Sequence, residues 1–109
     1  MNEVQAQLYQ VKKISVIAKG ADVLVREYVL GPGECIPWHH HTQVTDHYYS
    51  LEGMVSIETR VPATRRELNP GESATVTAPT AHRVSNSSGK PCRFLLIQGV
   101  GQYDFVKEE

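Results

Sequence analysis

Glycine and proline interrupt this chain at short intervals, and this punctuation limits what the chain can fold into. The breaks fall at Gly20, 31–33, Gly53, Pro62, 70–71, Pro79, 89–91, Gly99 and Gly101. Runs rich in β-branched and aromatic residues lie between them, at 21–30, 47–51, 54–60, 73–77, 82–85 and 93–98. Each run is typical of a short strand. Many short strands separated by frequent turns predict an all-β sandwich or barrel. Only the first dozen residues would also permit a helix.

One domain is enough to account for the chain. A length of 109 residues supports one compact domain rather than two, and the sequence shows no repeat, linker or low-complexity segment. Two turns are predicted in detail: a tight hairpin at Glu52 and Gly53, and a β-turn over 69–72 with proline second and glycine third. We therefore expect a single domain over 1–109.

Charge and composition exclude several classes of function. The chain has 11 basic and 12 acidic residues, so nothing favours binding to nucleic acid or to an anionic membrane. The arginines within 60–67 are expected on a solvated hairpin. The apolar stretch at 94–97 is far shorter than the roughly 20 residues that span a bilayer. The first residues lack a secretory pattern, so we expect a cytoplasmic protein with Cys35 and Cys92 as free thiols.

The segment from Gly33 to Gly53 carries most of the functional signal. It contains three consecutive histidines, His39 to His41, in a stretch otherwise suited to a β-strand. Because successive side chains of a strand point to opposite faces, His39 and His41 share one face and His40 faces away. Two imidazoles on one face are half of a transition-metal site.

The spacing of this segment resembles the first motif of the cupin superfamily. That motif runs glycine, five residues, His-x-His, three or four residues, glutamate, six residues, glycine. Here Gly33 is followed by five residues, then by His39 and His41, by four residues and Asp46, and by six residues and Gly53. The one departure is aspartate in place of glutamate.

A second segment resembles the second cupin motif, which runs glycine, five residues, Pro-x-Gly, two residues, histidine, three residues, asparagine. Here Gly71 is followed by five residues, by 77–79 in place of Pro-x-Gly, and then by His82 and Asn86 at the family's spacing. The two motifs, at 33–53 and 71–86, cover about half of the chain. The flanks, an N-terminal strand or arm at 1–20 and C-terminal strands and a tail at 93–109, fit the remaining strands of a barrel.

The resemblance implies a fold and a metal site. The fold would be a single-domain, type-2 cupin, an RmlC-like jelly-roll β-barrel (double-stranded β-helix). The metal would be held by His39, His41, Asp46 and His82. Three imidazoles and a carboxylate suit borderline divalent ions such as Mn, Fe, Ni, Co, Cu or Zn. Open coordination positions are expected.

The fourth ligand is the open question of this site. Aspartate is one methylene shorter than glutamate, so its oxygens would fall about 1 to 1.5 Å short, against a tolerance of ~0.2 Å in metal distances. Either the strand moves inward, or the carboxylate binds through water, or another residue replaces it. His47 would need a β-bulge to turn inward, and Gln43 is a weak oxygen ligand. We rank Asp46 first, then His47, then Gln43.

Other side chains are candidates for the same cavity. Tyr48 and Ser50 share the face of Asp46, and could bring a phenol and a hydroxyl near the metal, although a tyrosine there is more often core. Cys35 has the parity of His39, but a buried inert thiol is the simpler expectation. Arg26 on the early strand could bind a substrate carboxylate, although a solvent-facing position is more usual.

Two further roles are expected to be structural. Asn86 should hold the turn that follows the His82 strand. Tyr103 and Phe105, in the tail, look like a hydrophobic latch.

Two classes of function follow from the resemblance. The first is a mononuclear metalloenzyme that acts on a small oxygen-rich metabolite by dioxygenation, decarboxylation or isomerisation; thiol dioxygenases fit less well, because they lack the acid of the first motif. The second is a non-catalytic module that binds or senses a small molecule and uses the metal structurally. A metal-free effector binder is a third possibility. The two motifs predict metal ligands and do not by themselves identify a catalytic residue.

We also expect the chain to bind a small-molecule ligand and to pair. The apolar residues within 8–17 and the outward Trp38 and Tyr49 offer a surface, and a homodimer is the commonest closed assembly.

Overall fold

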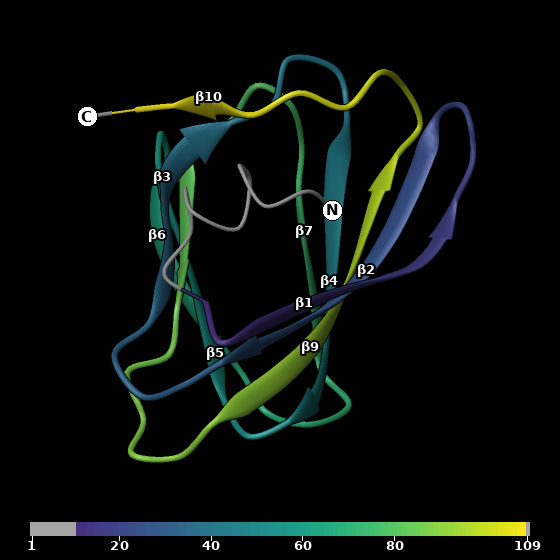
Figure 1. Cartoon of the computed structure of the whole chain (residues 1–109). Coiled ribbons are helices and arrows are strands. Elements are labelled where there is room, and N and C mark those ends of the chain that lie inside the picture. Colours follow the sequence, from purple (N-terminus) through teal and green to yellow (C-terminus); the bar gives the residue numbers. More distant parts are fainter. Residues whose placement is uncertain (1–10, 109) are drawn as a thin grey trace.

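The computed structural model describes residues 11–108, and these form ten strands with no helix among them (Figure 1). The strands are β1 (Lys13–Lys19), β2 (Val23–Leu30), β3 (Cys35–His40), β4 (Thr45–Glu52), β5 (Val55–Arg60), β6 (Ala63–Leu68), β7 (Ser73–Val76), β8 (His82–Ser85), β9 (Cys92–Gly99) and β10 (Val106–Lys107). Within the described part of the chain, no helix has the length and apolar character needed to cross a bilayer.

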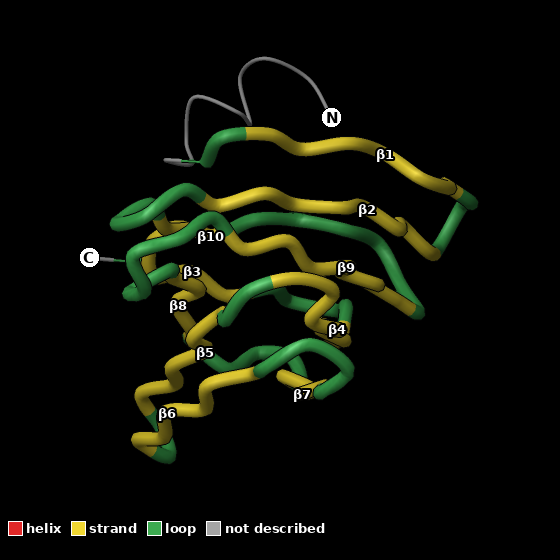
Figure 2. Tube along the Cα trace, turned by 90° about the horizontal axis from the view of Figure 1, so that it is seen from below, coloured by secondary structure: helices red, strands yellow, loops and turns green. Residues whose placement is uncertain are grey.

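The strands form two five-stranded antiparallel sheets that pack face to face. One sheet has the order β1-β2-β9-β4-β7, and the other has the order β10-β3-β8-β5-β6. In Figure 2 the strands of the first sheet follow one another from top to bottom on the right, and those of the second sheet do so on the left. The neighbours within each sheet are mostly distant in sequence, as expected of a jelly roll rather than a chain of hairpins. The predicted all-β jelly roll is confirmed.

The interior is built by alternation of buried and half-buried residues along central strands such as β9 and β2. On β9, Cys92, Phe94, Leu96 and Gln98 are buried, whereas the residues between them are half-buried. Alternate residues of a strand point to one face, so these four side chains enter the space between the sheets. Paired with them, β2 contributes Tyr28, whose ring stacks on Phe94 with centroids 5.2 Å apart.

The β-turn over 69–72 is confirmed, but the hairpin predicted at Glu52 and Gly53 is wrong: the chain turns tightly there, yet β4 and β5 belong to different sheets and do not pair. Glycine is needed at both turns. In the turn over 69–72, the Glu72 amide donates to the Asn69 carbonyl at 2.9 Å, and Gly71 has φ of 89°. Gly53 has φ of 70°, and a Cβ there would lie 2.6 Å from the carbonyl oxygen of Pro91. A side chain at residue 53 would therefore meet backbone that cannot move aside.

All six predicted strand runs are confirmed, with ends that differ by at most two residues. The hairpin over 60–67 is also confirmed: it joins β5 to β6, and its arginines Arg65 and Arg66 are exposed. The ambiguous N-terminal stretch lies mostly outside the described residues, and β1 begins at Lys13. Cys35 and Cys92 are free thiols.

A local irregularity in β3 changes one prediction. The register of β3 against β8 shifts between Ile36 and His39. Before the shift Ile36 is buried and Cys35 is half-buried; after it, His39 is buried. Simple alternation placed Cys35 on the face of His39, and this was wrong because the bulge reverses the parity.

Candidate metal centre

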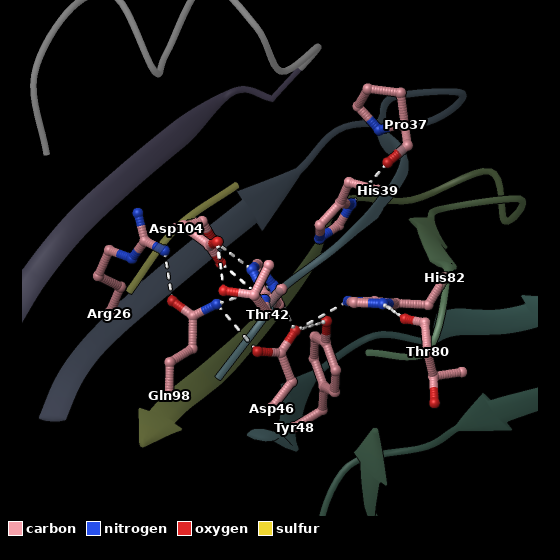
Figure 3. Close-up of polar contacts among 11 residues, drawn as sticks. Arg26, Pro37, His39, Thr42, Asp46, Tyr48, Thr80, His82, Gln98 and Asp104 are labelled. Atoms are coloured by element: carbon pink, nitrogen blue, oxygen red, sulfur yellow. Dashed lines mark hydrogen bonds and ion pairs between the residues drawn. The ribbon is translucent and has the colours of Figure 1, made fainter. Parts of the chain in front are cut away.

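The four predicted ligands come together between the sheets. His39 lies on β3 and His41 directly after it, His82 lies on β8, and Asp46 lies on β4. One donor atom from each lies within 4.8 Å of all the others. All four residues are at most 2 % exposed. Figure 3 shows Asp46 and His82 pointing toward one another across this site.

Strand pairing explains this convergence. His39 and His82 are direct partners in the β3–β8 register, so their rings lie side by side with centroids 4.2 Å apart. Asp46 belongs to the opposite sheet and faces them across the interior. Residues some forty positions apart in sequence therefore form one cluster.

Each histidine of the cluster is oriented by a main-chain carbonyl. The Nδ1 atoms of His39, His41 and His82 lie 2.7, 2.5 and 2.8 Å from the carbonyl oxygens of Pro37, Asp104 and Thr80. A carbonyl only accepts, so each Nδ1 carries the proton. Nε2 is then the atom that each ring offers to the centre, as in histidines that bind metal.

Asp46 is the hub of the cluster. Its Oδ2 lies 2.9 Å from Nε2 of His82 and 3.2 Å from Nε2 of His41, and it accepts a 2.6 Å hydrogen bond from the Tyr48 hydroxyl. Its Oδ1 accepts a hydrogen bond of 2.9 Å from the Gln98 amide. The shorter carboxylate therefore reaches the histidines, and the expected shortfall does not keep it out of the cluster.

The charges of the cluster differ from residue to residue. Burial, reinforced by the nearby His82, lowers the pKa of His39 to about 3. Burial also disfavours a charge on His41, but the hydrogen bond and charge of Asp46 outweigh it and raise the pKa of His41. Burial opposes ionisation of Asp46 too, yet the hydrogen bonds from His41 and His82 hold its pKa far below the ordinary value. His39 thus offers the lone pair of its Nε2, whereas the surroundings of His41 favour its protonated form, so a metal would compete with a proton there.

The two alternative fourth ligands lie elsewhere. His47 faces away from the cluster, and its Nδ1 lies 3.3 Å from the Thr75 hydroxyl. Gln43 is exposed, and its side-chain oxygen accepts from the Gln102 amide. Ser50, expected near the metal, instead donates to the Gly53 carbonyl at 3.3 Å. Of the three ranked candidates, only Asp46 joins the histidines.

Tyr48 lies in the core and near the metal centre, and Asn86 holds the turn after β8, as the sequence predicted. The Tyr48 ring is fully buried, and its hydroxyl binds Asp46, so one side chain serves both core and site. The Asn86 amide donates to the carbonyls of Leu30 and Lys90, and its oxygen accepts from Ser88. Asn86 therefore ties the turn after β8, which confirms its structural role.

Sequence reasoning missed Gln98 and the full role of Arg26. Gln98 Nε2 lies 3.3 Å from His41 Nε2 in addition to its bond with Asp46, and its Oε1 accepts from Arg26 at 2.5 Å. Arg26 is fully buried. It therefore does not face solvent, which is the more usual position of an arginine on a strand. One signal was available for Gln98: it has the inward parity of Phe94 and Leu96 but is polar.

The C-terminal segment covers the cluster. Phe105 stacks on the His39 ring with centroids 4.3 Å apart, and Tyr103 lies 5.6 Å from the His41 ring. The Asp104 carboxylate accepts from the main chain and the hydroxyl of Thr42, at 2.8 and 2.6 Å. In Figure 1 this yellow segment runs across one end of the sheets toward β10. The expected latch is therefore a wall of the site.

The donor set fits a divalent transition metal. Three neutral imidazole nitrogens and one carboxylate oxygen suit borderline divalent ions, and the carbonyl contacts supply the outer hydrogen bonds that such histidines usually have. The buried group of His39, His41, Asp46 and His82 could therefore hold one ion. Which metal it prefers depends on affinity order and cellular availability.

Comparison with solved structures shows the same fold. A recombinant oxalate oxidase in complex with glycolate has a TM-score of 0.71 at 15% identity, covering 79% of this chain and 46% of that one. The polyketide cyclase RemF from Streptomyces resistomycificus has a TM-score of 0.79 at 20% identity, covering 94% and 74%. A predicted oxalate decarboxylase from Thermotoga maritima has a TM-score of 0.73 at 16% identity, covering 80% and 78%. The chain thus spans less than half the length of the oxalate oxidase.

Sequence comparison identifies the family. No curated protein was found to match the chain. The model of the cupin domain matches residues 26–98, which include both histidine motifs and most of the two sheets. The fold, the motif spacing and this match agree, and the chain belongs to the cupin domain family.

Proposed function

We propose that this cupin is a mononuclear metalloenzyme that acts on a small oxygen-rich metabolite. The observation that carries the proposal is the set of three histidines whose Nδ1 atoms are all held by carbonyls, so that three Nε2 atoms and Asp46 face one point. A bound divalent ion would supply Lewis acidity or oxygen activation. Dioxygenation, decarboxylation and isomerisation are all compatible with such a centre. Of these three, the likeness to structures named for oxalate oxidation and decarboxylation supports decarboxylation.

The chain's own residues would prepare the reaction. His39, His41, His82 and Asp46 would hold the ion, and Tyr48 and Gln98 would fix the Asp46 carboxylate through one hydrogen bond on each oxygen. Phe105 and Tyr103 cover the His39 and His41 rings. They would keep bulk water from the centre, which strengthens every electrostatic interaction inside it.

The alternative is a non-catalytic binding module with a structural metal. One observation favours it: all four donors are buried, and Gln98 lies against His41 and Asp46 where a substrate would approach. A site closed by protein ligands is typical of structural metals, whereas a catalytic site keeps an open position. The two functions differ in whether an exogenous ligand reaches the ion.

Metal binding is tested first by elemental analysis of protein purified without a metal-affinity tag. We expect close to one equivalent of a divalent transition metal, and loss of that metal in His82→Gln. His47→Gln is the matched control, because His47 is a histidine on β4 that faces away from the cluster. Metal below about a tenth of an equivalent, with no uptake on reconstitution, would favour a metal-free binder.

Catalysis is tested on the reconstituted protein. Oxygen uptake, carbon dioxide release and isomerisation are followed with a panel of small 2-oxo acids, 2-hydroxy acids, oxalate and keto sugars. We expect turnover of at least one compound that His82→Gln abolishes and His47→Gln retains. Full metal occupancy without turnover on the panel, and without any effect of the compounds on the metal's spectrum, would support the structural alternative.

We also propose that the protein is a homodimer. Val16 and Ile17 on β1 and Tyr49 and Leu51 on β4 are large apolar side chains that remain exposed on one chain. Sedimentation should show twice the 12.2 kDa chain mass. A 12.2 kDa species at micromolar concentration would contradict the proposal.

A further inference from the structure

A cavity of about 380 Å³ lies next to the metal centre. Arg26, Gln98 and Tyr103 line its inner part, and the exposed Lys19 also lines it. None of the four candidate metal ligands belongs to its wall. Its volume falls within the range of roughly 300–1,000 Å³ that is usual for small-molecule sites.

The wall of the cavity is cationic. Among its ten lining residues are one lysine and one arginine, and none is an aspartate or glutamate. Two glutamine amides, from Gln98 and Gln102, add neutral hydrogen-bonding groups. Low-dielectric walls of one sign concentrate ligands of the opposite charge. A small anion is therefore the ligand that this wall favours.

Gln98 connects the cavity to the metal centre. Its Oε1 accepts from Arg26, and its Nε2 lies 2.9 Å from Oδ1 of Asp46 (Figure 3). The same Nε2 lies 3.3 Å from Nε2 of His41. The guanidinium in the cavity wall and the donors of the metal centre are thus separated by one amide. A ligand of a few atoms that displaces this amide would reach from Arg26 to the metal ligands.

The guanidinium of Arg26 is held in place before any ligand arrives. Its Cζ lies 4.9 Å from the centroid of the Tyr103 ring and 5.3 Å from that of the Tyr28 ring. Aromatic faces attract a cation and restrict its orientation. A fixed guanidinium presents its forked N–H groups to a carboxylate, which can accept two parallel hydrogen bonds.

We propose that this cavity is a binding site for a small organic acid. Arg26 anchors the carboxylate, Lys19 attracts it, and Gln98 is the amide that separates the acid from the metal centre. The proposal that the cavity binds a carboxylate does not depend on the proposed function. That the acid is the substrate of the centre rests on the proposed function.

The test uses metal-free protein, so that metal binding cannot mimic or mask the result. Malonate is titrated into the protein by calorimetry and by ¹⁵N NMR, with malonamide as a neutral probe of the same shape. We expect malonate to bind with Kd on the order of 1 mM or tighter and to shift the side-chain amide signal of Gln98. Malonamide should bind at least about tenfold more weakly, because it lacks the charge-assisted hydrogen bonds.

Three variants sharpen the test. Arg26→Gln should weaken malonate binding by about tenfold or more. Since Arg26 is buried and its loss could unfold the protein, Lys19→Gln provides an exposed alternative, with an expected loss of about threefold. Lys90→Gln is the matched control, because Lys90 is an exposed lysine outside this cavity, and it should bind as the unchanged protein does.

Several results would overturn the inference. These are no binding of malonate, equal binding of malonamide, or an equal loss in Lys19→Gln and Lys90→Gln. Inorganic phosphate that binds as tightly as malonate would replace the organic-acid assignment with a general anion site. Elemental analysis of the same preparations after metal loading reports on the metal centre separately, so failure of the proposed function and failure of this inference remain distinguishable.

Discussion

The interior between the two sheets has a polar end and an apolar end, and the same strands build both. On β2 the buried polar Arg26 is followed by the buried aromatic Tyr28, the next side chain on the same face. On β9 the buried Leu96 is followed in the same way by the buried polar Gln98. Asp46 and its partners fill the polar end, whereas stacked rings such as Tyr28 and Phe94 fill the apolar end. Both ends are equally buried.

The comparison teaches that burial alone does not separate core from site. At the apolar end each side chain stabilises the fold through the apolar surface it removes from water and the volume it fills. In the polar end each buried group requires a partner, because an unsatisfied buried charge is costly. Changes at the apolar end should therefore alter stability and spare metal binding, whereas changes at the polar end should alter metal binding.

Phe94→Ala should have the largest effect on stability. Phe94 is fully buried against Tyr28 and Tyr48. Its truncation leaves a cavity, and we expect the free energy of unfolding to fall by about 3–5 kcal/mol in urea denaturation. Metal content per folded molecule should not change. If the alanine variant does not fold, Phe94→Leu replaces it in the test. Leu95→Ala, on the other face of β9, is the control and should lower the free energy of unfolding by less. Metal loss in folded Phe94→Leu protein would contradict the separation of the two ends.

Asp46→Asn is the corresponding change at the polar end. The amide keeps the volume but loses the negative charge, so we expect metal affinity to fall by about a hundredfold or more. Competition with a fluorescent chelator measures this affinity. Asp22→Asn, an exposed aspartate, is the control. Equal affinities in Asp46→Asn and the unchanged protein would remove Asp46 from the ligands.

The pH dependence of the metal-free protein should come from the polar end. The pKa of His39 is about 3 in the folded protein and 6.5 otherwise, so between these values the unfolded chain binds more protons. Stability should therefore fall as the pH drops from 6.5 toward 3, by up to about 1.4 kcal/mol per pH unit. The raised pKa of His41 stabilises the fold below pH 6.5, and this stabilisation is lost only as the pH rises above 6.5. The lowered pKa of Asp46 adds a further loss of stability only below pH 3.8.

Urea denaturation in the presence of a chelator at pH 6.5, 5.5 and 4.5 measures this slope. The variant H39Q lacks the titrating group and should show a flatter profile. A slope in H39Q as steep as that of the unchanged protein would rule out His39 as its source.

Arg65→Ala should have the smallest effect, because it belongs to neither end of the interior. The side chain is 46% exposed and lies 3.5 Å from Glu58 and 3.6 Å from Glu67. Exposed ion pairs contribute little, so the free energy of unfolding should change by about 0.5 kcal/mol or less. Both metal affinity and the pH profile should be retained. A loss above about 1 kcal/mol would show that this hairpin supports the core.

The sequence predicted those parts of the molecule that depend on local pattern. Strand runs, the turn glycines and the histidine spacing were readable because parity and turn chemistry act over a few residues. His39, His41, Asp46 and His82 were found through the family's spacing, which already encodes the pairing of β3 with β8.

The missed features depend on distant packing. The orientation of Gln98 toward His41 requires the register of β9 against β4, and the contact of Asp104 with His41 requires the path of the C-terminal segment. The error in predicting the direction of Cys35 arose from the bulge between Ile36 and His39, which simple alternation ignores. Arg26 was identified as a candidate carboxylate ligand, but its full burial depends on Tyr103 and Gln98 closing over it.

The three carbonyls that orient the histidines have a consequence for how this site tolerates mutation. They belong to the main chain of Pro37, Thr80 and Asp104, so no side-chain replacement at these positions deletes the oxygen itself. In sites where carboxylates orient the histidines, a single substitution removes that control. Here the path of the backbone places the three carbonyl oxygens, and these oxygens keep the proton of each ring on Nδ1. The sequence around the ligands can therefore drift while the same nitrogen of each ring continues to face the centre.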